Sequence, residues 1–150
     1  MKKWSFVIGS VLTALGAVLH FAIIIGGPDW YRASGAGEKL AQIAASGSLY
    51  PAFLGTCLAF IFLGWSAYAL SGAGLIGRLP LLKFALPAIA LLCTVRGVYG
   101  FFVPFFVKTG YVINLGVGFW VYSSLIWLTI GLSYFAGISL NWTYIANKHE

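Results

Sequence analysis

Four long stretches of the chain are almost free of charged residues. They cover about residues 4–26, 50–70, 80–107 and 111–137. None of them alternates polar and apolar positions, and each is about twice the length of a membrane β-strand. At 1.5 Å per residue the first stretch extends for roughly 34 Å, enough to cross a hydrocarbon core of about 30 Å. The pattern therefore predicts four transmembrane helices.

A shorter helix is expected between the first two stretches. Pro28 ends the first stretch, because proline lacks an N–H group and disfavours helical geometry in the residue before it. Over residues 38–46, the apolar side chains Leu40, Ile43 and Ala44 share one helical face. A helix of this length is not stable alone in water, so we expect it at the membrane interface or across the mouth of the bundle.

The composition places these helices in a membrane. Apolar residues make up 61% of the chain and charged residues only 8%, with a mean hydropathy of +0.94. Soluble domains carry roughly a quarter charged residues. The length of 150 residues fits one domain. The sequence therefore predicts an all-α fold, a single four-helix transmembrane domain over residues 1–150.

The basic residues of the loops predict the orientation. Five lie on the side of the termini and three on the other side. Because Lys and Arg are enriched in cytoplasmic loops, both termini are expected in the cytoplasm. The first loop would then be extracytoplasmic, which in a Gram-negative bacterium means periplasmic. The first group is Lys2, Lys3, Arg78, Lys83 and Lys148, and the second is Arg32, Lys39 and Lys108.

Arg96 is a charged residue far from either end of a predicted span. A lone guanidinium costs at least about 2.5–3.5 kcal/mol near the bilayer centre. Its helical neighbours Cys93, Tyr99 and Gly100 predict a polar, partly small face toward the bundle interior. If the helix ends near Gly100, Arg96 can reach the outer surface. If the helix continues to Pro104, Arg96 lies nearer the midplane.

A second ionisable side chain, His20, lies in the first span. It continues a stripe of small and polar residues on one helical face, made by Gly9, Thr13 and Gly16. Such a stripe predicts a helix contact, with His20 about 9 Å below the outer end of the span. This position is compatible with a packing histidine and equally with one that binds a ligand or transfers a proton.

Two of the three acidic residues lie in the loop after the first span. Near-buried cations such as Arg96 and His20 need anionic partners. Asp29 and Glu38 are therefore expected to orient these two side chains or to control the entry of a ligand to the pocket that they line. The alternative is local, because Asp29 can cap the turn after Gly27 and Glu38 can stabilise the positive end of its short helix.

Aromatic residues gather at the outer ends of the spans. Most of them, Trp120 included, fit an aromatic belt at the membrane interface. A smaller subset, Trp30, Tyr50 and Tyr99, could wall a cavity around an amphiphile. The candidate ligand site comprises His20, Asp29, Trp30, Arg32, Glu38, Tyr50, Arg96, Tyr99 and Asn114, with Thr56 and Ser124 as further hydrogen-bonding candidates.

No sequence motif assigns a reaction. The chain has no glycine-rich phosphate loop, no HExxH and no CxxC, so neither a metal centre nor a cofactor is expected. Cys57 and Cys93 lie inside spans and are interpreted as packing residues. The basic rim fits anionic lipid headgroups rather than nucleic acid. Whether the protein is an enzyme is left open by these observations.

Several short motifs carry a resemblance to known proteins. GPDWYRASGAGE, PAFLGT, GWSAYALSGAG, LPLL and RG, within residues 26–97, resemble a group of small uncharacterised bacterial four-span membrane proteins. The resemblance implies a four-helix inner-membrane protein and no particular activity. Small multidrug exporters also have four spans, but they carry a glutamate in the first span, where this chain has His20 as its only ionisable residue.

We therefore expect a polar pocket, open to the periplasmic side, that binds an amphiphilic or anionic ligand such as a lipid headgroup or a quinone. Arg96 would hold the anionic or carbonyl group, and His20 would donate or shuttle a proton. One alternative is a small homo-oligomeric transporter, which needs a polar path that the nearly apolar cytoplasmic half does not offer. Another is a packing subunit of a larger membrane complex, in which Arg96 pairs with another chain.

Overall fold

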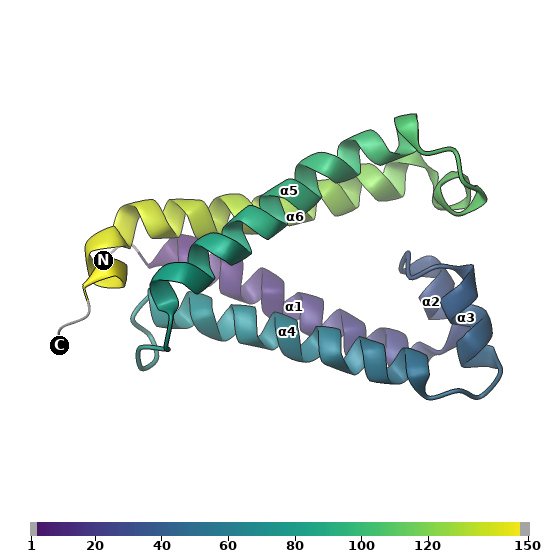
Figure 1. Cartoon of the computed structure of the whole chain (residues 1–150), viewed down its shortest axis with the longest axis horizontal. Helices are drawn as coiled ribbons and strands as arrows, with labels where there is room; N and C mark the ends of the chain where they lie inside the picture. Colours follow the sequence, from purple (N-terminus) through teal and green to yellow (C-terminus); the bar gives the residue numbers. More distant parts are fainter. Residues whose placement is uncertain (1–2, 148–150) are drawn as a thin grey trace.

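The computed structural model describes residues 3–147, and every regular element in that range is a helix. Four helices are long and apolar enough to cross a membrane, and two short ones lie between the first and second of these (Figure 1). The expected all-α, four-span membrane fold with a short helix between spans is confirmed. The long helices are α1 (Trp4–Gly26), α4 (Tyr50–Gly72), α5 (Leu82–Phe106) and α6 (Gly110–Ala146), and the short ones are α2 (Pro28–Ala33) and α3 (Glu38–Ala45).

The long helices form two antiparallel pairs, α1 with α4 and α5 with α6 (Figure 1). Both pairs share the largest apolar core at the end where α1 starts and α6 finishes, which we call the terminal end. Toward the opposite end, which carries α2 and α3 and which we call the loop end, the pairs diverge. There the cores are separate, one around Tyr31 that joins α1 to α2 and α3 and one around Trp120 between α5 and α6.

Glycines permit the close approach of α5 to α6. A Cβ atom on Gly97 would lie 2.8 Å from the backbone nitrogen of Leu128, and one on Gly131 would lie 2.8 Å from that of Thr94. Ordinary contact begins at 3.4 Å, so neither position accepts a side chain unless the helices separate. Small residues at such crossings are the usual way for membrane helices to pack. Because Arg96 precedes Gly97, this crossing also holds Arg96 close to α6.

The stripe of small and polar residues on α1 faces the protein interior, as the sequence predicts. Gly9 lies against the ring of Tyr134 from α6, and Gly16 lies against the ring of Phe62 from α4. The fully buried Thr13 hydroxyl donates to the carbonyl of Gly9, at 2.8 Å. The stripe therefore joins α1 to both of its neighbours and leaves His20 at its loop-end limit.

Two features of the helices differ from the sequence prediction. The last span was expected to end at Gly137, but a Cβ atom there would lie 2.7 Å from the ring of Phe6, so this glycine packs against α1 and α6 continues. In addition, residues 28–33 form a second short helix, α2, which the hydrophobic pattern does not predict. Pro28 ends α1, as predicted, and also occupies the first turn of α2, where its missing N–H group costs nothing.

Candidate functional site

The length of α5 decides the depth of Arg96. The helix continues through Pro104 to Phe106, so Arg96 lies ten residues, or about 15 Å, before its loop-end limit. Arg96 is therefore close to the middle of a span, which is the deeper of the two positions that the sequence allows. At this depth an unpaired guanidinium is most costly.

The Arg96 guanidinium lies against two indole rings of α6. Its central carbon is 5.5 Å from the ring centre of Trp120 and 5.9 Å from that of Trp127. The Nη1 atom is buried and has no hydrogen-bond partner within residues 3–147. Cation–π attraction contributes about 0.5–2 kcal/mol per ring, but it leaves the N–H donors of Nη1 unpaired.

Two further buried polar atoms beside Arg96 lack a hydrogen-bond partner in the described part of the chain. They are Oγ of Ser124 and Nε1 of Trp120. Ser124 Oγ and Arg96 Nη1 flank Gly100 so closely that a Cβ atom there would collide with both. Buried polar groups are nearly always paired, and leaving one unpaired costs about 1–3 kcal/mol. Three such atoms therefore lie in one small region of the described residues.

His20 approaches the same region from α1. Its ring centre is 5.1 Å from that of Phe62, which is 5.7 Å from the ring of Trp127. Trp127 also contacts Arg96, so two rings separate the His20 and Arg96 side chains. We call Phe62, Trp65 and Trp127 the aromatic cluster, because their rings contact one another.

The contacts of His20 determine which ring nitrogen carries its proton. Nδ1 lies 2.7 Å from the carbonyl oxygen of Gly16. A carbonyl oxygen only accepts, so Nδ1 must be the donor. In the neutral ring Nε2 then has the free lone pair, which can accept a hydrogen bond or a proton.

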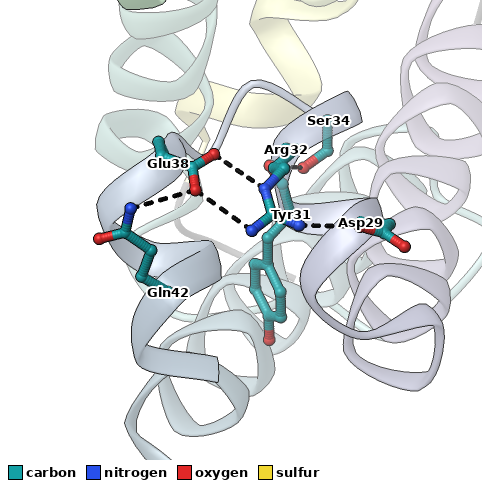
Figure 2. A network of polar contacts seen from close by, with 6 residues as sticks. All are labelled: Asp29, Tyr31, Arg32, Ser34, Glu38 and Gln42. Atoms are coloured by element: carbon teal, nitrogen blue, oxygen red, sulfur yellow. Dashed lines mark hydrogen bonds and ion pairs between the residues drawn. The ribbon is translucent and has the colours of Figure 1, made fainter. Parts of the chain in front are cut away.

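The two acidic residues of the first loop bind Arg32 (Figure 2). Nη1 of Arg32 donates to Asp29 at 2.8 Å, and Nε and Nη2 donate to the two carboxylate oxygens of Glu38 at 2.8 and 3.1 Å. Within residues 3–147 neither carboxylate forms an ion pair with Arg96 or His20. The partners that the sequence suggested for the two buried cations are therefore occupied elsewhere.

This Arg32 network, made by Asp29, Arg32, Glu38 and Gln42, joins α2 to α3. Hydrogen bonds from Arg32 lower the pKa of Glu38, with a further donor from Gln42 at 3.2 Å. The same contact with Glu38 raises the pKa of Arg32. All three charged side chains are exposed, and exposed pairs contribute little to stability. Tyr31 points away from the network in Figure 2, and its ring belongs to the apolar cluster that α2 and α3 form with Ile23 of α1.

The turn between α2 and α3 also contacts the second helix pair. The hydroxyl of Tyr111 donates to the carbonyl of Gly35, and the ring of Phe119 lies against the same glycine. The Tyr111 ring is 6.4 Å from that of Trp120, which contacts Arg96. The α2–α3 segment thus bridges the two pairs at the loop end, and two aromatic rings connect it to Arg96.

The remaining candidates contribute no buried group to this region. Trp30, Tyr50, Tyr99 and Asn114 are exposed, and Trp30 packs against Gly26. Tyr99 was expected on the interior face of α5, yet 58% of it is accessible. That face therefore does not include Tyr99.

Sequence reasoning missed the two tryptophans that contact Arg96. Trp120 and Trp127 are seven residues apart, and this spacing puts them on one face of α6. This spacing can be read from the sequence, but the sequence does not show which helix packs against that face of α6.

The side chains at Arg96 are suited to bind a hydrogen-bond acceptor. Guanidinium and indole N–H groups only donate, and the Ser124 hydroxyl can rotate to donate. A carboxylate or a phosphate has enough acceptor positions for all three, and a single carbonyl oxygen has enough for two of them. The chain matches no known family model, and neither a curated protein nor a solved structure is similar to it, so these residues are the basis on which its function is inferred.

Proposed function

We propose that this membrane protein binds an amphiphilic or anionic ligand, such as a lipid headgroup or a quinone, at Arg96. One observation carries the proposal. Arg96 Nη1 is buried near the middle of a span and has no hydrogen-bond partner in the described residues. The neighbouring atoms Ser124 Oγ and Trp120 Nε1 are also buried and also lack a partner there. Ligand oxygen atoms would give these donors the partners that the chain does not supply.

The energetics favour a bound molecule over an empty site. A hydrogen bond to a charged group contributes about 1.5–3 kcal/mol, comparable to the cost of a lone guanidinium in the membrane. His20 lies across the aromatic cluster and would offer Nε2 to a hydroxyl or acidic proton of the ligand. In this proposal Arg96 holds the ligand and His20 accepts or returns a proton.

The loop end is proposed to face the periplasm of a bacterial inner membrane, with both termini in the cytoplasm. The distribution of Lys and Arg supports this orientation. The α2–α3 segment would then cover the periplasmic side of the site through its contact with Tyr111.

Thermal-shift and native mass-spectrometry measurements test the proposal. Wild-type protein in detergent is screened against phospholipids, isoprenoid phosphates and quinones. A ligand at about 100 times its dissociation constant stabilises by about 2.7 kcal/mol, and Arg96→Gln should remove this gain. Gly100→Ala should also remove it, because the added methyl group displaces the guanidinium while the charge is kept.

Lys83→Gln is the matched control, because Lys83 is an exposed cation on α5 at the terminal end. This variant should respond to the ligand as wild type does. Equal responses from wild type and Arg96→Gln across the whole panel would refute the proposal. A partner protein that co-purifies with wild type and is lost from Arg96→Gln would instead favour a packing subunit.

A further inference from the structure

We infer that the ligand at Arg96 is an anion with an apolar chain, its carboxylate or phosphate bound to Arg96, and not a neutral quinone or ester. This inference rests on the proposed function and narrows its ligand class. It depends on the charge balance of the spans, on the donors around Arg96 and on the surface from which Arg96 is reached.

The positive charge of Arg96 has no counterion among residues 3–147. Asp29 and Glu38 are both bound to Arg32, in the loop outside the spans. The third acidic residue, Glu150, lies outside the described residues. A neutral carbonyl would satisfy N–H groups but leave an unbalanced cation inside the membrane, whereas an anion satisfies the donors and balances the charge.

The unpaired groups around Arg96 complement an anion in number and in kind. Nη1 of Arg96 and Nε1 of Trp120 only donate, and the Ser124 hydroxyl can donate as well. A carboxylate offers about four lone-pair positions and a phosphate offers more, while a ketone oxygen offers two. Charge-assisted hydrogen bonds are also roughly twice as strong as neutral ones.

The surface around Arg96 indicates that the anion carries an apolar chain. Arg96 itself is partly accessible, and its neighbours on the same face of α5, Leu92 four residues before it and Tyr99 three residues after it, are each 58% accessible. In a span these side chains face acyl chains. A small inorganic anion would lose its hydration to reach this depth, whereas an amphiphile brings only its headgroup to Arg96 and leaves its chain in the lipid.

Pairs of ligands that differ in charge and little else test the inference. Oleate is compared with methyl oleate, and phosphatidylglycerol with diacylglycerol, using wild-type protein in a neutral detergent. At least one anion should bind about tenfold or more tightly than its neutral partner, a difference of about 1.4 kcal/mol. The pair that shows the difference distinguishes a fatty-acid carboxylate from a phospholipid phosphate. A quinone is included as the neutral carbonyl ligand.

The variants separate this site from general attraction to a basic protein. Arg96→Gln should abolish the preference for the anion, Arg96→Lys should retain part of it, and Lys83→Gln should leave it unchanged. If the quinone or the neutral partner binds as tightly as the anion, and Arg96→Gln loses that binding, the ligand class is wrong while the proposed function stands.

Two other results would overturn the inference. If Arg96→Gln keeps the full preference for the anion, the anion binds elsewhere on the protein. If no compound binds wild type, the inference and the proposed function both fail. Should Arg96→Gln not fold, the paired comparison on wild type still decides between anion and neutral ligand.

Discussion

The tight crossing of α5 and α6 predicts a clear cost for one added methyl group. In Gly131→Ala the new Cβ atom would collide with the Thr94 hydroxyl and lie 2.8 Å from the backbone nitrogen of the same residue. The hydroxyl cannot turn away freely, because it donates to the carbonyl of Ala90 at 2.8 Å. The backbone contact is about 0.6 Å shorter than the 3.4 Å of ordinary contact, so the helices must move apart.

Overpacking of this kind costs about 1–3 kcal/mol. Membrane helices persist when their tertiary contacts are lost in a denaturing detergent, so the higher helix propensity of alanine largely cancels between the two states. The assay is reversible unfolding in mixed micelles of increasing dodecyl sulfate content, followed by tryptophan fluorescence. Gly131→Ala should unfold at a clearly lower dodecyl sulfate fraction than wild type.

The control is Gly64→Ala, in the interior of α4. A Cβ atom at Gly64 meets no other atom within 4 Å, so its stability should stay within about 0.5 kcal/mol of wild type. If the two variants unfold at the same detergent fraction, α5 and α6 do not cross as closely as described. The close crossing would then no longer explain why Arg96 lies beside α6.

Two more predictions concern the loop end. On a cysteine-free background, an impermeant thiol reagent should label Lys39→Cys from outside intact cells and Lys83→Cys only after permeabilisation; the reverse pattern would place the loop end in the cytoplasm. An NMR titration should show Glu38 ionising below the ordinary glutamate pKa of about 4.3, and Arg32→Gln should return it toward that value. Because the folded pKa is the lower one, the stabilising contribution of this contact is complete above the unfolded pKa and is lost as the pH falls through the folded value. A titration midpoint at or above the ordinary value would contradict the Arg32 network.

The four-span fold could be predicted from the sequence because each apolar run must satisfy its backbone hydrogen bonds internally once it is in lipid. The end of the last span could not be predicted in this way. A glycine at a helix end and a glycine at a helix crossing look the same in a sequence, and Gly137 is the second kind, since it packs against Phe6. The distinction depends on a neighbour that is far away in the chain.

Arg96 could be identified from the sequence because a single charge in an apolar span is conspicuous. Its neighbours could not be identified in the same way. The sequence groups Trp120 with the other aromatic residues of the outer ends, but it is only 8% accessible and contacts Arg96, so its ring packs inside the protein. Only the crossing of α5 and α6 at Gly97 and Gly100 decides which ring meets the guanidinium.

The ion pair between Asp29 and Arg32 could have been predicted from the sequence. Arg32 follows Asp29 by three residues, a spacing that brings two side chains together on a helix. The hydrophobic pattern predicts no helix over residues 28–33, and without a helix this spacing does not indicate a contact, so the sequence points to Arg96 as the partner instead. Glu38 joins Arg32 only because the turn between α2 and α3 reverses the chain.

The two interruptions of α6 bear on how membrane thickness affects the protein. The backbone leaves helical geometry at Gly116 and at Asn141, and the intervening residues 117–140 extend about 36 Å. That length slightly exceeds a hydrocarbon core of about 30 Å, so the interruptions fall near its two surfaces. Leu128 lies midway between them and packs against Gly97, which puts Arg96 at the depth farthest from water on either side. If Arg96 binds the proposed ligand, acyl-chain length should change its occupancy, because a thinner bilayer brings water closer to the guanidinium and lowers the cost of leaving it without a partner.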